Sequence, residues 1–418
     1  MRLNVTVFGQ PAGILEQTSP AGYRFTYFPG ANPLSLTMPV REAPYQLPHL
    51  PPIFQVSLPE GDLRVLLERD LTRQEREQGD MAILSQVGRH LIGAVAVAPD
   101  GAFESPQSVS LITDQEIGSL LRQRATKEGV ASLIERYARQ SGVSGGYLKV
   151  LVSSISADRQ EDWIVKLPSA THPHVVTNEF FSMQAARFSG IETAHTRLSD
   201  DGQLLLVRRF DRTPEGALLG FEDMASLLGL PSGLKFSGSV ERILKTITIF
   251  CDGPSQTPSL RQFFRQYALA MILRNGDAHL KNFGLLYPQG GHVRLAPCYD
   301  MVTMAAYAPR QNNGKTLDIP ALMWGGTKRW PSRDHLERLA SLCREDAPSA
   351  LSAIEAGVHR AAASLCAYVR DHPDFREHGD TMLRLWREGL TQAGLRAEFS
   401  RDATDDERPN TATDADPR

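Results

Sequence analysis

The stretch that decides the fold is Asn275-Gly276-Asp277-Ala278-His279-Leu280-Lys281-Asn282-Phe283, which follows a strongly apolar segment at residues 259–274. It places an Asp and an Asn five residues apart in a polar loop. This spacing suits phosphoryl transfer, because the Asp accepts or orients the proton of an attacking hydroxyl and the Asn offers Mg²⁺ an oxygen ligand. The stretch therefore predicts a catalytic loop with Asp277 as base and Asn282 as metal ligand. The alternative is that both are turn or capping residues.

A second acid is needed for the metal, because Mg²⁺ prefers carboxylate and phosphate oxygens. Asp300, in Pro297-Cys298-Tyr299-Asp300-Met301, can supply it. Apolar residues 283–287 and 293–295 flank a Pro-Gln-Gly-Gly turn, which predicts a hairpin. That hairpin would hold Asp277, Asn282 and Asp300 around one pocket. His279 is expected to brace the loop or to pack as a neutral histidine, without binding metal.

A lysine and a glycine turn lie upstream of this loop. Lys166 sits inside an apolar strand, Trp163-Ile164-Val165-Lys166-Leu167, where an unpaired ammonium would be costly to bury. Nucleotide phosphates would explain it, with Glu179 on the next helix as its partner; an edge strand that faces water is the alternative. The turn at residues 141–149 (SGVSGGYLK) lets backbone amides approach phosphates, although a plain hairpin would have the same glycines.

The order of expected elements gives an α+β, two-lobed architecture. Alternation broken by Gly and Pro predicts hairpins over residues 1–30, and helical spacing follows over residues 60–93 and 113–138. Strands are expected at residues 150–152, 163–167 and 204–207, and a helix over residues 177–188. From residue 221 on, the pattern is helical, over residues 221–230, 240–250, 259–275, 334–368 and 374–395. Residues 396–418 are polar and charged, which predicts a disordered tail.

Composition excludes several classes of protein. The 418 residues are 41% hydrophobic and 22% charged, which is ordinary for a globular chain. The formal charge of −3 gives no basic excess for a free-standing nucleic-acid binder. The four cysteines have neither zinc nor C-x-x-C spacing, which is typical of a reducing compartment. No secretory signal or long apolar run is present, so we expect a cytoplasmic protein that does not bind a membrane.

Taken together, these stretches resemble the HipA family, the serine/threonine-kinase toxins of bacterial type II toxin–antitoxin modules. The resemblance covers roughly residues 1–395, and the N-G-D-x-H-x-x-N loop followed by Tyr-Asp is its most specific part. The other matching stretches are residues 32–39 (NPLSLTMP), 54–61 (FQVSLPEG), 88–94 (GRHLIGA), 164–168 (IVKLP), 178–179 (NE), 209–212 (RFDR), 222–223 (ED) and 235–239 (KFSGS).

The resemblance implies a phosphoinositide-kinase-like fold with a small N-terminal α+β subdomain (residues 1–105), a kinase N-lobe (residues 106–220) and an all-helical C-terminal lobe (residues 221–395). It implies ATP and Mg²⁺ as cofactors, with Asp277, Asn282 and Asp300 catalytic and the last two binding the metal. The ATP-binding residues it implies are Lys166, Glu179, Gly145, Gly146, Val207, Arg209, Phe210 and His279.

The resemblance also implies partners. Family members phosphorylate a protein, typically an aminoacyl-tRNA synthetase, which slows translation and arrests growth. They bind a HipB-like helix-turn-helix antitoxin, so DNA would be contacted only through that partner. They also phosphorylate a serine of their own glycine turn, for which Ser144 and Ser141 are the candidates. The chain departs from the family pattern at Tyr147, where a glutamine is usual, and at Arg208, where a glutamate is common.

Two other functions compete with a toxin kinase. The Asp-x-x-x-x-Asn loop is locally similar to that of aminoglycoside and choline phosphotransferases, so a small-molecule kinase is one alternative. The N-terminal 105 residues oppose it, since they resemble HipA and not those enzymes. A degenerate kinase that acts as a binding partner or corepressor is the other alternative, and the intact set of Asp277, Asn282, Asp300 and Lys166 opposes it.

Overall fold

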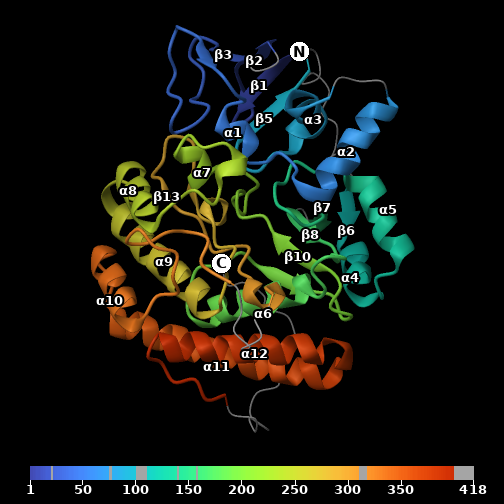
Figure 1. The fold of residues 1–418 in the computed structure, drawn as a ribbon. Coiled ribbons are helices and arrows are strands. Elements are labelled where there is room, and N and C mark those ends of the chain that lie inside the picture. The colour runs from blue at the N-terminus through green and yellow to red at the C-terminus, as the bar shows by residue number, and fades with distance from the viewer. Residues whose placement is uncertain are drawn as a thin grey trace.

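The computed structural model describes residues 1–19, 22–74, 78–99, 111–138, 141–156, 159–309 and 318–399. The chain folds into three parts, which we call the N-terminal subdomain, the N-lobe and the C-lobe. Figure 1 shows the N-terminal subdomain at one end of the molecule and the paired helices α11 and α12 at the opposite end. The alpha-plus-beta, two-lobed fold expected from the sequence is confirmed.

The N-terminal subdomain is a five-stranded antiparallel sheet with short helices, in the order β4-β3-β2-β1-β5. The alternating Leu3, Val5 and Val7 point into its core, and the hairpins expected over residues 1–30 are present. Its elements are β1 (Arg2–Val7), β2 (Gln10–Ser19), β3 (Gly22–Tyr27), β4 (Tyr45–Leu47), α1 (Pro52–Gln55), α2 (Gly61–Arg73), α3 (Asp80–Val87), η1 (Gly88–His90) and β5 (Val95–Ala98).

The N-lobe is a five-stranded sheet in the order β6-β7-β8-β10-β9. The three strands expected from the sequence are all present, as β7, β8 and β10. Residues 113–138 form two helices and not one, because Thr126 caps a second helix through the backbone N–H of Gly129 at 3.0 Å. The elements are β6 (Leu111–Thr113), α4 (Asp114–Arg122), α5 (Lys127–Tyr137), β7 (Lys149–Ser156), β8 (Arg159–Lys166), α6 (Val175–Phe188), β9 (Thr196–Leu198) and β10 (Leu205–Arg208).

The C-lobe is mostly helical, and it also carries a three-stranded antiparallel sheet in the order β11-β12-β13. The expected hairpin is present as β12 and β13, with Leu285 opposite Leu295. The expected helix over residues 221–230 is wrong at its start, because Phe221 and Glu222 pair with β12 as part of β11. The description of this lobe as all-helical therefore needs the small sheet added.

The elements of the C-lobe follow one another as β11 (Gly220–Asp223), α7 (Met224–Leu227), η4 (Ser232–Leu234), α8 (Val240–Phe250), α9 (Gly253–Ile272), η5 (Leu280–Asn282), β12 (Gly284–Tyr287), β13 (Arg294–Leu295), η6 (Met304–Tyr307), α10 (Arg333–Leu342), α11 (Ala347–Asp371), η7 (Pro373–Phe375) and α12 (Arg376–Gln392). One core cluster joins α6 of the N-lobe to these helices. Within it the Trp386 indole N–H donates to the Thr303 hydroxyl at 2.7 Å, which anchors the chain three residues after Asp300.

Two buried carboxylates join the N-terminal subdomain to the rest of the chain. Asp211 accepts the backbone N–H of Gly93 at 2.6 Å and the Nε–H of Arg209 at 2.9 Å. Glu222 accepts the Ser35 hydroxyl at 2.6 Å and the Leu36 N–H at 2.7 Å. Because a buried carboxylate is costly unless it is hydrogen-bonded or paired, these contacts hold the subdomain against the rest of the chain.

Two expectations concern the ends and the surface of the chain. Most of the predicted tail, residues 400–418, lies outside the described residues, as does the proposed boundary near residue 105. Among the residues that are described, no helix has the length and apolar character needed to cross a membrane.

We expect Asp211→Ala to lower the free energy of unfolding by about 3–5 kcal/mol, because it leaves the buried Arg209 guanidinium without its partner. Urea denaturation followed by tryptophan fluorescence measures this. Glu192→Ala is the matched control, since it breaks an exposed pair with Arg294 and costs about 1 kcal/mol or less. Equal losses in the two variants would contradict the role given to Asp211.

Candidate active site

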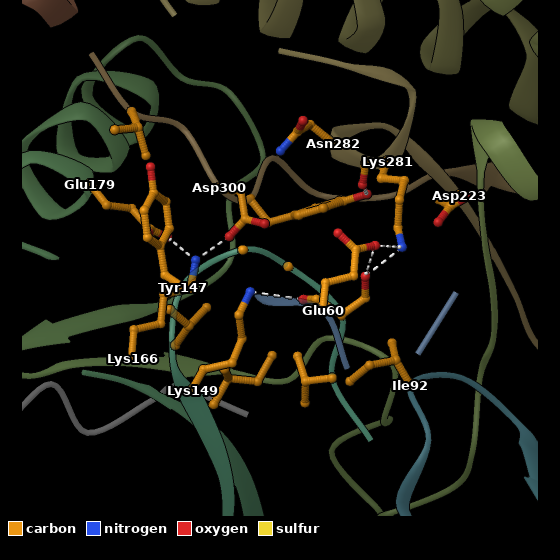
Figure 2. Close-up of a pocket in the computed structure, with 18 of the residues that line it drawn as sticks. Glu60, Ile92, Tyr147, Lys149, Lys166, Glu179, Asp223, Lys281, Asn282 and Asp300 are labelled. Atoms are coloured by element: carbon orange, nitrogen blue, oxygen red, sulfur yellow. Dashed lines mark hydrogen bonds and ion pairs between the residues drawn. The ribbon is translucent and has the colours of Figure 1, made fainter. Parts of the chain in front are cut away.

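One pocket lies where the three parts of the molecule meet. The N-terminal subdomain contributes Val56, Glu60 and Ile92 to its wall, and the N-lobe contributes Lys149 and Lys166. Residues of the predicted catalytic loop and the Tyr-Asp motif close the other side (Figure 2). All three predicted catalytic residues, Asp277, Asn282 and Asp300, line this pocket.

Lys166 is held between two carboxylates at the end of β8. Its Nζ donates to Glu179 Oε1 at 2.6 Å and also contacts Asp300 Oδ1 (Figure 2). Burial opposes the charges of Lys166 and Asp300, but their attraction is stronger: the pKa of Lys166 is raised and the pKa of Asp300 is held well below its usual range. The predicted Lys166–Glu179 pair is therefore present, and the edge-strand alternative for Lys166 is wrong, since this residue is 6% exposed.

Asp300 has a left-handed backbone, with φ of +53°. A residue with a Cβ pays of order 1–3 kcal/mol for such a conformation, and it persists where the surroundings enforce it. The hairpin β12–β13 delivers the chain to this point, and the Tyr299 hydroxyl donates to the carbonyl of Lys281 at 2.8 Å. The Tyr-Asp motif is thus tied to the catalytic loop, and the Asp300 carboxylate points toward Lys166.

The catalytic loop is shaped by its two asparagines. The backbone N–H of Asp277 donates to Asn275 Oδ1 at 3.1 Å, and that of His279 donates to Asn282 Oδ1 at 3.0 Å. Asn282 therefore does have the capping role of the alternative reading. A carboxamide oxygen has two lone pairs, so this cap leaves one free for a metal.

The carboxylate of Asp277, in contrast, is not used to build the loop. It accepts no hydrogen bond from the part of the chain that the structure describes, and His279 Nε2 is 4.0 Å away. Its side chain is 41% exposed, toward the pocket. The pKa of Asp277 is raised to about 6, because burial and the nearby Asp300 raise it by more than Lys235 lowers it. A carboxylate with this pKa is ionised at neutral pH and can accept a proton.

His279 packs behind the loop. It is 6% exposed, and its ring lies edge-on to Phe236 with 5.0 Å between the ring centroids. Burial, together with Lys235 and Lys281, lowers the pKa of His279 to about 3, so the ring is neutral. These contacts agree with the expected bracing role, although His279 also borders the pocket.

The residues present fit a magnesium ion held jointly with phosphates. The described residues contain no group of three His, Cys, Asp or Glu side chains arranged to hold a metal alone. Asp300 and Asn282 instead offer two hard oxygen donors on one pocket. Mg²⁺ in phosphoryl-transfer sites is commonly bound by one or two such ligands plus substrate phosphates and water.

The glycine turn covers the pocket from the N-lobe side. Gly145 has φ of +128°, a backbone conformation that residues with a Cβ rarely adopt, and the Lys149 ammonium lies against it. Lys149 Nζ donates to the carbonyl of Ser144 at 2.8 Å, which folds the turn back on itself. Gly146 and Tyr147 also line the pocket, so the residue that departs from the family pattern is part of the site.

The two candidate serines of this turn differ. Ser144 lies in the pocket and its hydroxyl donates to Glu60 Oε1 at 2.9 Å. Ser141 is fully buried: its hydroxyl donates to the carbonyl of Tyr137 at 2.7 Å and accepts the N–H of Leu151 at 2.8 Å. Modification of Ser141 would require this segment to unfold locally, whereas Ser144 already faces the pocket.

The ATP-binding residues implied at and just after β10, namely Val207, Arg209 and Phe210, all line the pocket but differ in their contacts. Val207 lies opposite Ile164 in the sheet, and both form an apolar wall of the pocket. The Phe210 ring packs against Phe221 and Tyr299, with centroids 5.7 and 5.5 Å apart. Arg209 also lines the pocket, and because its guanidinium is buried on Asp211 and the carbonyl of Leu91, a contact with a nucleotide would come from its backbone.

Sequence reasoning missed seven charged residues that line the pocket: Glu60, Lys149, Arg208, Asp211, Asp223, Lys235 and Lys281. A local signal existed for Lys149, which faces Lys166 in the register of the predicted hairpin, and for Lys281, which lies beside Asn282. For Glu60 and Lys235 no local pattern shows that they meet, since 175 residues separate them.

Comparison with known families identifies the chain. The family model for the HipA-like C-terminal domain matches residues 141–365, and that for the HipA N-terminal domain matches residues 3–98. The chain belongs to the HipA family. The second model covers most of the N-terminal subdomain, and the first spans most of the N-lobe and the C-lobe.

Relatives and a solved structure agree with this assignment. Two proteins of Sinorhizobium fredii are similar: the putative kinase Y4dM is 31% identical over 70% of each chain, and the putative kinase Y4mE is 25% identical over 66% of this chain and 69% of its own. The HipA structure from Shewanella oneidensis, solved with HipB and operator DNA, superposes with a TM-score of 0.63 at 17% identity and covers 94% of this chain and 98% of its own. At that identity the match supports the fold.

We expect Lys166→Met to destabilise the protein more at pH 8 than at pH 5. Without the ammonium, the buried Glu179 and the nearby Asp300 repel each other, at a cost of about 3–5 kcal/mol when both are ionised. Protonation at low pH relieves that repulsion, so the loss shrinks as pH falls. Urea denaturation at both pH values measures it, with the exposed Lys245→Met as control. A loss independent of pH would contradict the ion-pair account.

Proposed function

We propose that the protein is an ATP- and Mg²⁺-dependent serine/threonine protein kinase that acts as the toxin of a toxin–antitoxin module. The observation that carries the proposal is the carboxylate of Asp277, which accepts no hydrogen bond from the described residues and shares a pocket with the Lys166–Glu179–Asp300 cluster. Membership of the HipA family and the names of the relatives support it.

In this proposal each side chain has a distinct task. Asp277 orients the acceptor hydroxyl and takes its proton. Lys166, kept in place by Glu179, neutralises phosphate oxygens. Asp300 and Asn282 would hold Mg²⁺, which supplies charge stabilisation for the transferred phosphoryl group when bound. The apolar wall at Val207 and Ile164 would take the flat face of the adenine ring.

A substrate and a partner follow from the family. We propose a component of translation, such as an aminoacyl-tRNA synthetase, as the phosphorylated protein, and growth arrest as the consequence. A HipB-like helix-turn-helix antitoxin is the proposed partner, because the Shewanella oneidensis relative was solved with HipB and operator DNA. DNA contact would then be made through the antitoxin. Ser144, which lies in the pocket, is the proposed site of autophosphorylation.

Asp277→Asn tests the base directly. We expect it to reduce transfer of phosphate from radiolabelled ATP by about 10²–10⁴-fold, because a carboxamide cannot accept the proton. Binding of Mg·ATP, measured by calorimetry, should persist, since the proposed phosphate and metal groups remain. Undiminished transfer would remove Asp277 from the mechanism, and absence of nucleotide binding by the wild type would favour a degenerate kinase.

The pH profile gives an independent test. Because the base must be ionised and its pKa is raised to about 6, kcat/KM should rise with pH through about 6 and level off above it. Asp318, beside Gly276, also has a pKa raised by burial to about 6. Asp318→Asn should therefore keep the same acid limb. A flat profile, or a limb lost in Asp318→Asn, would contradict the assignment to Asp277.

Mass spectrometry of phosphopeptides after brief expression in cells tests the substrate class. We expect phosphoserine or phosphothreonine on a translation protein in cells that express the wild type, and none in cells that express Asp277→Asn. Rapid phosphorylation of a small alcohol, with no protein modified, would favour the small-molecule alternative.

A further inference from the structure

A single carboxylate of the N-terminal subdomain reaches into the kinase pocket. Glu60 lies between Pro59 and the start of α2, and its Oε1 accepts from Lys281 Nζ and from the Ser144 hydroxyl, each at 2.9 Å. Its Oε2 accepts from Lys235 Nζ at 3.0 Å. One side chain therefore links the glycine turn, the segment before α8 and the catalytic loop, as Figure 2 shows for Lys281.

The backbone beside Glu60 is fixed by a close contact. Gly61 has φ of +55°, and a Cβ on it would lie 2.5 Å from the carbonyl oxygen of Gly146. The N-terminal subdomain thus touches the glycine turn backbone to backbone, with no side chain between them. This contact sets how far the Glu60 carboxylate extends over the pocket.

Lys281, which pairs with Glu60 from the catalytic loop, needs the Glu60 carboxylate to balance its charge. The Lys281 side chain is 8% exposed, and its Nζ donates to the Ser232 hydroxyl at 3.0 Å and contacts that of Ser144. Hydroxyl groups do not neutralise an ammonium, and a buried ammonium is costly unless a counter-ion balances it. Among the described residues Glu60 is the carboxylate that forms an ion pair with Lys281, at 2.9 Å, while the buried Asp223 acts on it electrostatically without such a contact.

The same lysines would attract the phosphates of a nucleotide. Burial alone would raise the pKa of Glu60, yet Lys281 and Lys235 outweigh it and lower that pKa to about 2, so the side chain carries a full negative charge at neutral pH. Glu60 therefore balances two ammonium groups on the pocket wall. The carboxylate holds them in position, and it also weakens the pull that they exert on any other anion.

We propose that Glu60 is a positioning residue, through which the N-terminal subdomain fixes Lys281, Lys235 and the glycine turn in the arrangement needed for phosphoryl transfer. The N-terminal subdomain is then a working part of the kinase site, and not a separate binding module. This inference rests on the proposed function. Asp277 and Lys166 would carry the chemistry, while Glu60 acts through Lys281 and Ser144.

Glu60→Gln removes the charge and keeps nearly the same shape. We expect kcat to fall roughly tenfold, because Lys281 and the glycine turn lose their shared anchor. We expect Mg·ATP to bind about two- to tenfold more tightly, because two lysines lose a competing anion. A purely structural defect would not tighten nucleotide binding, so a lower kcat together with a lower Kd for Mg·ATP is the decisive readout.

Two further variants separate the effect of the Glu60 charge from the effect of its side-chain length. Glu60→Asp keeps the charge on a side chain one methylene shorter, so nucleotide affinity should stay at the wild-type value while kcat falls; it also serves if Glu60→Gln does not fold. Glu68→Gln is the matched control, since Glu68 lies on α2, pairs with Arg64 at 2.8 Å and does not border the pocket. It should leave both constants unchanged.

A measurement without nucleotide separates this inference from the kinase assignment. Lys281 and Lys235 should react with an amine-labelling reagent severalfold faster in Glu60→Gln than in the wild type, as read by mass spectrometry. Unchanged labelling would refute the contact, and faster labelling with unchanged kcat and ATP affinity would refute the positioning role. An inactive wild type would defeat the proposed function, and labelling would still decide whether Glu60 holds Lys281.

Discussion

The buried ammonium of Lys166 is the constraint on which the site depends. An ammonium that is 6% exposed must be paired, and here Glu179 from α6 and Asp300 from the loop after β13 pair with it. These two carboxylates come from different lobes, so the pair also holds the lobes at one distance. Asp300 has a left-handed backbone, and the contacts around it must offset the free-energy cost of that conformation. The same geometry leaves the carboxylate proposed to bind the metal beside the lysine proposed to bind phosphate.

Charge is divided between two walls of the pocket. On one wall the carboxylates of Glu179 and Asp300 surround Lys166, and on the other the ammonium groups of Lys235 and Lys281 surround Glu60. Asp277 lines the same pocket, and its carboxylate accepts no hydrogen bond from the residues that the structure describes. The N-terminal subdomain contributes to the second wall, and the buried Asp211 and Glu222 clamp it there. A bound triphosphate would thus face ammonium groups, and an attacking hydroxyl would face a carboxylate. Three parts of one chain supply these charges.

Local patterns predicted much of this molecule. The strands around Lys166, the helix that carries Glu179 and the hairpin before Asp300 were predictable from alternation and turn residues, and the Asp277–Asn282 spacing identified the loop. Phe221 was predicted as helical because the apolar spacing of residues 221–230 does not reveal pairing with β12, which lies some 60 residues further on. Glu60 was missed for the same reason: its partners Ser144, Lys235 and Lys281 are distant in sequence, and spacing carries no information about them.

A crystal structure with Mg²⁺ and a non-hydrolysable ATP analogue tests the central claim most directly. The account predicts phosphate oxygens against Lys166, the metal on Asp300 and Asn282, and the terminal phosphate facing Asp277 across the pocket. Asp300 would then give up its contact with Lys166 to the metal, while Glu179 keeps its own. A nucleotide bound elsewhere, or one bound here with the Lys166–Asp300 pair intact and no metal on Asp300, would contradict the account.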